Sequence, residues 1–183
     1  MLLFSLAKPN LKFTKLNQIA DGSLSAKCLD LVTTWFTDEW GYIHDKDKTR
    51  EQAIGDRKKY LAENADKIHL AFYGDLIVGA FRIEYKEFDE ELLNSQIRKG
   101  WQDKLQTSEI WFIYVDPTYR GLGAGRQIVQ EIKRLSKAEM RASMVLLETL
   151  KPGLNHLYRT EDAELVCENY LDHNPTDVLR IKL

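Results

Sequence analysis

One continuous stretch, residues 109–140, constrains the fold of this 183-residue chain more than any other. It opens with six bulky residues, Ile110–Val115, a composition that predicts a strand buried on both faces. Proline cannot donate to a strand ladder, so Asp116 and Pro117 end that strand. A glycine-rich run, 121–125, comes next, followed by apolar residues at helical spacing: Ile128, Val129, Ile132 and Leu135. We therefore expect a long helix that begins inside the glycine-rich run.

The start of that helix has the chemistry of an anion site. The first turn of a helix leaves about four backbone N–H groups unpaired and carries a partial positive charge. Glycines allow close backbone approach, and Arg120 and Arg126 add positive charge beside the loop. These features suit a pyrophosphate. The chain has no P-loop spacing, and Arg126 stands where a dinucleotide fingerprint starting at Gly121 needs its third glycine.

These residues resemble a known signature. Arg120-x-x-Gly123-x-Gly125, after a strand that ends Tyr114-Val115-Asp116-Pro117-x-Tyr119, is similar to the Gln/Arg-x-x-Gly-x-Gly/Ala motif of the GNAT superfamily of acyl-CoA-dependent N-acetyltransferases. The resemblance implies that the backbone of residues 113–115 pairs with the pantetheine arm of acetyl-CoA, and that residues 120–126 hold its pyrophosphate. The implied cofactor-binding residues are Ile113, Tyr114, Val115, Arg120, Gly121, Leu122, Gly123, Ala124, Gly125 and Arg126.

Two helices are predicted near the N-terminus. Asp21 opens the first, whose apolar stripe consists of Leu24, Cys28, Leu31, Val32, Trp35 and Phe36. We expect residues 35–40 to end this helix, in a loop that by the resemblance walls an acceptor pocket. Thr49 caps the second helix, which reaches about Glu63, and Gln52 completes a capping box.

The remaining pattern predicts a mixed sheet. Residues 11–16 form a first strand, and residues 70–73 and 76–85 form a hairpin. The acidic insertion between residues 86 and 108 predicts an extra helix, either a solvated cover for the sheet or a substrate lid. Residues 143–149 form a strand parallel to the central one, because a helix connects them.

A short helix carrying Tyr158 and two closing strands, 164–170 and 177–182, complete the order. It matches an α/β (α+β) GNAT fold of about seven strands and four or five helices. We expect a single domain over residues 1–183.

Composition excludes several classes of protein. A net charge of −2 and 44% hydrophobic residues indicate a soluble globular domain with no bias toward nucleic acid or membranes. The opening residues lack the features of a signal peptide or a membrane span. Cys28 and Cys167 stand far apart, so a reducing cytoplasm is expected, and the four histidines share no metal-ligand spacing.

Acyl transfer to an amine needs a base and an acid. The amine attacks only when unprotonated, although its ordinary pKa is about 10.4, and a protonated group helps the thiolate to leave. For the base we favour Glu109, where the resemblance places the glutamate of histone-modifying members and where apolar neighbours would raise its pKa. Glu84, Glu148 and water chains are alternatives. The resemblance makes Tyr158 the acid, although the family asparagine is Lys151 here and a Gly-Phe pair is replaced by Asp162 and Ala163.

The sequence thus predicts an N-acetyltransferase that moves an acetyl group from acetyl-CoA to an amine within a ternary complex. Two alternatives stay open, a non-catalytic acyl-CoA sensor or scaffold and a dinucleotide-dependent redox enzyme. The acceptor is not encoded in any motif, but the acidic insertion favours a cationic amine. Either a monomer or a homodimer is compatible with the sequence.

Overall fold

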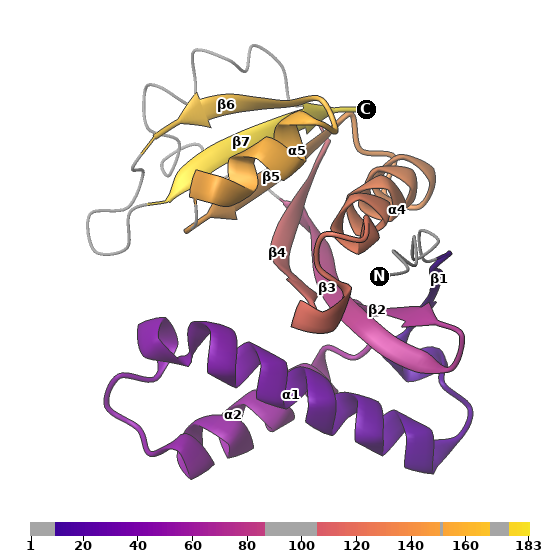
Figure 1. The fold of residues 1–183 in the computed structure, drawn as a ribbon, viewed down its shortest axis with the longest axis vertical. Coiled ribbons are helices and arrows are strands. Elements are labelled where there is room, and N and C mark those ends of the chain that lie inside the picture. The colour runs from indigo at the N-terminus through magenta and orange to yellow at the C-terminus, as the bar shows by residue number, and fades with distance from the viewer. Residues whose placement is uncertain (1–9, 87–105, 151, 169–175) are drawn as a thin grey trace, which may run out of the picture. The chain divides into compact units, whose positions relative to one another are not determined.

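The structure, a computed structural model, describes residues 10–86, 106–150, 152–168 and 176–183. Its strands form one mixed seven-stranded sheet in the order β1-β2-β3-β4-β5-β7-β6 (Figure 1). The strands are β1 (Lys12–Lys15), β2 (Ile68–Tyr73), β3 (Leu76–Lys86), β4 (Thr107–Val115), β5 (Met144–Thr149), β6 (Ala163–Cys167) and β7 (Asp177–Lys182). The described residues also contain the helices α1 (Gly22–His44), α2 (Arg50–Glu63), α4 (Ala124–Ala138) and α5 (Asn155–Arg159).

This architecture confirms the predicted α/β fold, its seven strands and the order of its elements. The helix predicted between β3 and β4 falls on residues 87–105, outside the described part of the chain.

Two compact units make up the chain. The N-terminal unit consists of Met1–Arg82 and Ile113–Ala124, and the C-terminal unit consists of Ile83–Phe112 and Gly125–Leu183. The strands β3 and β4 therefore contribute residues to both units.

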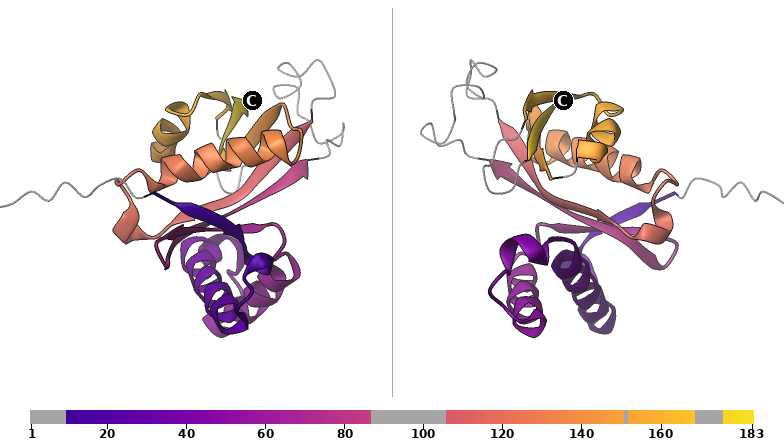
Figure 2. Two further views of the ribbon diagram at one scale, coloured as in Figure 1. Left: turned by 90° about the vertical axis from the view of Figure 1, so that its right-hand side faces the viewer. Right: turned by 60° about the vertical axis from the view of Figure 1, so that its left-hand side comes forward.

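Within the N-terminal unit, antiparallel strands accompany a pair of helices. Phe13 of β1 lies opposite Ala71 of β2, and Leu70 lies opposite Ala80 of β3. Gly74 turns the chain between β2 and β3 with φ of +60°, which confirms the predicted hairpin. The helices α1 and α2 pack side by side (Figures 1 and 2).

Both helices begin at the predicted caps. The Asp21 carboxylate accepts hydrogen bonds from the N–H groups of Ser23 and Leu24 at 2.8 and 3.0 Å. At α2, the Gln52 N–H donates to Thr49 Oγ1 and the Thr49 N–H donates to Gln52 Oε1, so the capping box is confirmed.

The predicted end of α1 is wrong. The helix continues through residues 35–40 and ends only at His44, so the expected acceptor-pocket loop is helical there. Aromatic rings explain the continuation, because Phe36 and Trp40, four residues apart, pack with their centroids 4.9 Å from each other. The apolar stripe also begins later than predicted, since Leu24 is 39% exposed while Cys28 is buried.

The C-terminal unit contains the predicted parallel pair. β4 and β5 pair from Thr107 opposite Met144 to Ile110 opposite Leu147, and β5 also pairs antiparallel with β7. The apolar face of α4 is buried as predicted, at Ile128, Val129, Ile132 and Leu135. A buried hydrogen bond of 2.7 Å between Ser108 Oγ and Ser136 Oγ ties β4 to α4.

β4 is not buried on both faces, contrary to prediction. Ile110 and Phe112 are buried, but Trp111 between them is 54% exposed. Alternate side chains of a strand point to opposite faces, so only the face carrying Ile110 and Phe112 is covered at this point.

Candidate active site

The glycine-rich loop has the backbone conformation that its sequence requires. After β4, the Asp116 carboxylate accepts a hydrogen bond from the Thr118 N–H at 2.8 Å, and the 3-10 turn η2 (Pro117–Tyr119) follows. Gly121 and Gly123 then adopt φ angles of +76° and +90°, which other residues rarely adopt. The space where a Cβ would lie is open at both glycines. The predicted helix start inside the loop is confirmed, since α4 begins at Ala124.

These features fit a pyrophosphate. Backbone N–H groups at the start of α4 are donors for an anion, and the open space beside Gly121 and Gly123 lets a ligand approach the backbone.

Arg120 binds three groups of its own unit. Its Nε donates to the Val115 carbonyl oxygen at 2.8 Å, and its Nη2 lies 3.7 Å from a Glu39 carboxylate oxygen on α1. The guanidinium also lies over the Tyr114 ring, 5.4 Å from the centroid. The Arg120 side chain therefore connects α1 to the end of β4.

Arg126 is held in the same way within the C-terminal unit. Its Nε lies 3.1 Å from the carboxylate of Glu161, whose side chain is only 8% exposed. Gln130 donates to the same carboxylate at 3.3 Å, and Lys133 donates to the Glu161 backbone carbonyl at 3.1 Å. Both arginines beside the loop are thus paired with glutamates.

The end of β4 has one edge turned away from β3. The Asp116 N–H donates to the Val78 carbonyl of β3 at 2.9 Å. Backbone groups of successive strand residues point to alternate edges, so the N–H and C=O groups of Ile113 and Val115 point away from β3. The pairing of β4 with β5 ends at Ile110, three residues before Ile113. The resemblance assigned residues 113–115 to the pantetheine arm, and of these Ile113 and Val115 have their backbone groups on this edge.

Glu109 does not have the apolar surroundings predicted for it. Lys86 Nζ contacts its carboxylate, and the two side chains are 30% and 19% exposed respectively. A charged lysine therefore lies beside Glu109, in place of the purely apolar surroundings that were expected.

The pKa of Glu148 on β5 is shifted in the direction that was expected for Glu109. Desolvation by the surrounding protein raises its pKa, Lys86 opposes this rise and Glu109 adds to it. Glu148 is nevertheless exposed at the surface, so water reaches its carboxylate although nearby protein atoms partly desolvate it. Glu109 lies opposite Leu146, and Glu148 follows Leu146 by two residues, so the two carboxylates share one face of the sheet. We refer to Lys86, Glu109 and Glu148 as the charged cluster.

Tyr158 lies on α5 and is buried, with 7% of its surface exposed. This burial raises the pKa of its phenol to about 12. Asn155 anchors the same short helix, because its Nδ2 donates to Asp177 Oδ2 of β7 at 2.6 Å. The phenol therefore stays protonated at neutral pH, in a fixed element of the C-terminal unit.

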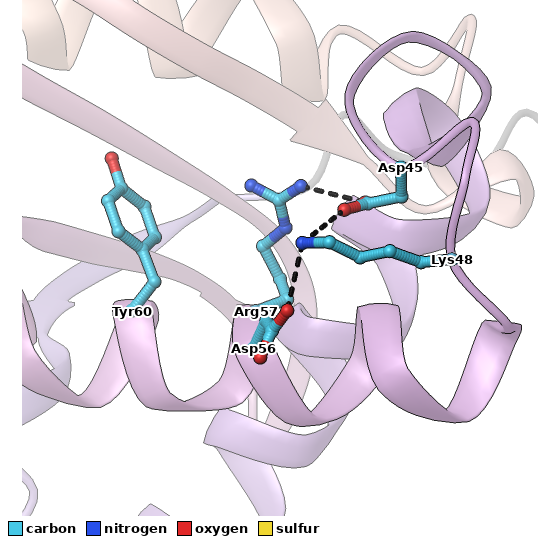
Figure 3. Close-up of a pocket in the computed structure, with 5 residues that line it drawn as sticks. All are labelled: Asp45, Lys48, Asp56, Arg57 and Tyr60. Atoms are coloured by element: carbon cyan, nitrogen blue, oxygen red, sulfur yellow. Dashed lines mark hydrogen bonds and ion pairs between the residues drawn. The ribbon is translucent and has the colours of Figure 1, made fainter.

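A separate polar pocket of about 270 Å³ lies on α2 and the turn before it (Figure 3). Asp45, Lys48, Asp56, Arg57 and Tyr60 line it, and none of them is a predicted site residue. Asp45 pairs with Arg57 at 3.0 Å and with Lys48 at 3.3 Å, while Lys48 pairs with Asp56 at 2.8 Å. The two carboxylates and the two cations neutralise one another, so the network stabilises the turn between α1 and α2.

The sequence is that of a known family. Residues 29–160, more than two thirds of the chain, match the Acetyltransferase (GNAT) family. The chain belongs to this family. Its GNAT fold also resembles solved structures, although no curated protein is a sequence match.

Three GNAT-fold relatives illustrate the structural likeness. The NatC complex bound to Gag peptide and CoA has 14% identity and a TM-score of 0.59, over 95% of this chain and 99% of that one. Campylobacter jejuni N-acetyltransferase PseH in complex with acetyl coenzyme A has 13% identity and a TM-score of 0.55, over 94% and 99%. The putative arylalkylamine N-acetyltransferase 7 of the mosquito Aedes aegypti has 13% identity and a TM-score of 0.61, over 98% and 97%.

Two features are absent from the described residues. No helix among them is long and apolar enough to cross a membrane. Likewise, the described His, Cys, Asp and Glu side chains form no group of three or more that could hold a metal ion.

Sequence reasoning missed two participants in this arrangement. Neither Glu39 nor Lys86 was singled out, because each acts through a residue distant in the chain, Arg120 and Glu109 respectively. An acidic residue on an aromatic-rich helix and a lysine at a strand end carry no local signal of such a partner.

Proposed function

We propose that this GNAT protein transfers the acetyl group of acetyl-CoA to a primary amine in a ternary complex. The observation that carries the proposal is the glycine-rich loop, where Gly121 and Gly123 adopt positive φ angles just before the start of α4. The backbone there suits a pyrophosphate, and the β4 edge at Ile113 and Val115 suits an extended amide-containing arm. Acetyl-CoA carries both groups.

The roles of the cofactor-binding residues follow from this geometry. Residues 121–125 contribute backbone N–H groups, and Arg120 and Arg126 lie on either side of them. Because Arg120 and Arg126 are paired with Glu39 and Glu161, their charges are partly neutralised. The backbone therefore supplies most of the attraction for the pyrophosphate.

Tyr158 is the proposed acid. Attack of the amine nitrogen on the thioester carbonyl forms a C–N bond, and departure of the sulfur breaks the C–S bond. A thiol has a pKa of about 8.5, so the thiolate is a moderate leaving group that does not require full protonation as the C–S bond breaks. A buried phenol with a pKa of about 12 is a weaker acid than that thiol, so it keeps its proton and donates a hydrogen bond that stabilises the negative charge developing on sulfur.

The proposed base is a carboxylate of the charged cluster. Glu109 remains a candidate through its position on β4, and Glu148 is favoured by its raised pKa, which brings it closer to neutral pH. Either carboxylate would take the proton that the attacking ammonium must lose. The two negative charges against one lysine also favour a cationic acceptor, as the acidic insertion does.

Calorimetric titration with acetyl-CoA tests donor binding. Gly123→Ala places a side chain at a φ of +90° and should weaken binding at least about tenfold, because the loop backbone must move. Gly74→Ala is the matched control, since Gly74 has a φ of +60° and equally open space but belongs to the β2–β3 turn and not to the glycine-rich loop. Equal effects of both substitutions, or no binding by the wild-type protein, would remove the basis for the donor site.

Release of free thiol in the presence of an amine panel tests the chemistry. Tyr158→Phe should lower kcat about tenfold or more while the affinity for acetyl-CoA is retained. Glu109→Gln and Glu148→Gln are compared at the same pH, and the variant with the larger loss of kcat at unchanged affinity for acetyl-CoA identifies the base. Binding of acetyl-CoA with no thiol release for any amine would instead support the sensor or scaffold function.

A further inference from the structure

The residues around Arg120 assign a role to Glu39 that the family motif does not contain. Glu39 lies on α1, at a residue distant in sequence from the glycine-rich loop, and its carboxylate lies 3.7 Å from Arg120 Nη2. Its side chain is 21% exposed, whereas that of Arg120 is 50% exposed. A mostly buried carboxylate therefore contacts Arg120, the residue directly before the glycine-rich loop.

The same guanidinium also acts on β4. While Nη2 faces Glu39, the Nε of Arg120 donates to the Val115 carbonyl oxygen at 2.8 Å. Val115 is on the β4 edge that points away from β3, at the end of the segment proposed to pair with acetyl-CoA. A guanidinium has donors on several nitrogens in a rigid plane, so one side chain can hold both partners at once.

The adjacent aromatic residues fix this arrangement further. Tyr114 stacks on Trp35 of α1, with ring centroids 4.8 Å apart, and meets the edge of Trp40 at 6.4 Å. Arg120 lies over the same Tyr114 ring. Residues 35–40 of α1 therefore contact both the end of β4 and Arg120.

We propose that Glu39 is a positioning residue for the acetyl-CoA site, acting through Arg120. The Glu39 carboxylate orients the Arg120 guanidinium, and the guanidinium holds the Val115 carbonyl. The end of β4 and the glycine-rich loop thereby keep the spacing that acetyl-CoA needs. Arg120 then acts mainly by ordering the backbone and not by direct contact with phosphate. This inference rests on the proposed acetyl-CoA binding.

The two possible roles of Arg120 predict opposite effects of Glu39→Gln. If Arg120 bound phosphate directly, Glu39 would compete for it and repel the anion, so removing the carboxylate would tighten binding. If Glu39 positions Arg120, the same substitution weakens binding. The single ammonium of lysine cannot reach both the Val115 carbonyl and Glu39 as the planar guanidinium does. In the positioning role, Arg120→Lys should therefore weaken acetyl-CoA binding as much as Arg120→Gln, although it keeps the positive charge.

Calorimetry with acetyl-CoA as the probe decides between them. We expect Glu39→Gln, Arg120→Gln and Arg120→Lys each to raise the Kd about fivefold, with the double variant Glu39→Gln/Arg120→Gln no weaker than the single ones. Asp38→Asn is the control, because Asp38 is the neighbouring acid on α1 and pairs with Arg50 of α2. Its Kd should stay within about twofold of wild type. Thermal unfolding confirms that each variant is folded.

Each outcome has one meaning. Tighter or unchanged binding by Glu39→Gln, additive losses in the double variant, or near-normal binding by Arg120→Lys overturns the positioning role while acetyl-CoA binding by the wild type stands. Absence of binding by the wild type overturns the proposed function and this inference together. In steady-state assays the effect should fall on the KM for acetyl-CoA, with kcat little changed, because neither residue touches the reacting atoms.

Discussion

Replacing Tyr158 with phenylalanine tests the burial on which the proposed acid role depends. Folding raises the pKa of the phenol from about 10 to about 12. Between these values the unfolded chain releases the phenolic proton and the folded chain keeps it, so stability falls as the pH rises. The contribution of the protonated phenol is fully present below the unfolded pKa and is lost as the pH passes the folded pKa.

The size of the effect follows from the shift. One pKa unit corresponds to about 1.4 kcal/mol, so the loss reaches about 1.4 kcal/mol near pH 11 and approaches about 2.7 kcal/mol above pH 12. Tyr158→Phe lacks the titrating group and should lose less stability over the same range. The difference in unfolding free energy between the two proteins should therefore change steadily with pH.

Urea unfolding of both proteins at several values between about pH 8 and pH 11 measures this difference. Titration of the lysines and the other tyrosines is common to both proteins and cancels. Tyr73→Phe is a suitable control because Tyr73 is 43% exposed, and its profile should follow that of the wild type. A difference between wild type and Tyr158→Phe that stays constant across this range would show that the phenol is not buried, and the proposed acid would lose its physical basis.

Three further substitutions test other parts of the fold. Thr49→Ala removes the capping box of α2 and should lower the unfolding free energy by about 1 kcal/mol, measured by urea unfolding. Asp177→Ala takes away the partner of the buried Asn155 amide and should cost about 1–3 kcal/mol in the same assay. Hydrogen bonds from Lys182 and Arg180 lower the pKa of Glu164, so its contribution is present above the ordinary glutamate pKa and is lost as the pH falls. Glu164→Gln should therefore flatten the acidic side of the stability profile, and an unchanged acid-unfolding curve would contradict this.

Features fixed by local physics could be predicted from the sequence. The caps at Asp21 and Thr49, the turn at Gly74 and the start of α4 each depend on residues within a few positions. The apolar face of α4 was equally clear because its spacing is helical.

Features that depend on distant residues could not be predicted. Six apolar residues in a row do not reveal which face of a strand is covered, and so the exposure of Trp111 was missed. The extra length of α1 was missed because Trp35 and Trp40 also pack against Tyr114 of β4, which lies far along the chain. The pairing of Glu109 with Lys86 and the raised pKa of Glu148 depend on strand register, which the sequence does not specify.

The shared strands limit how this protein can be divided. The chain passes between its two units at residues 82/83, 112/113 and 124/125, and the first two crossings fall inside β3 and β4. Neither unit therefore corresponds to a contiguous gene segment that could be cloned, exchanged in a chimera or lost by truncation without cutting a strand. We propose on this ground that residues 1–183 act as one domain. A split or circularly permuted version is better opened at the exposed β2–β3 turn around Gly74, because a break there falls between two strands and not inside one.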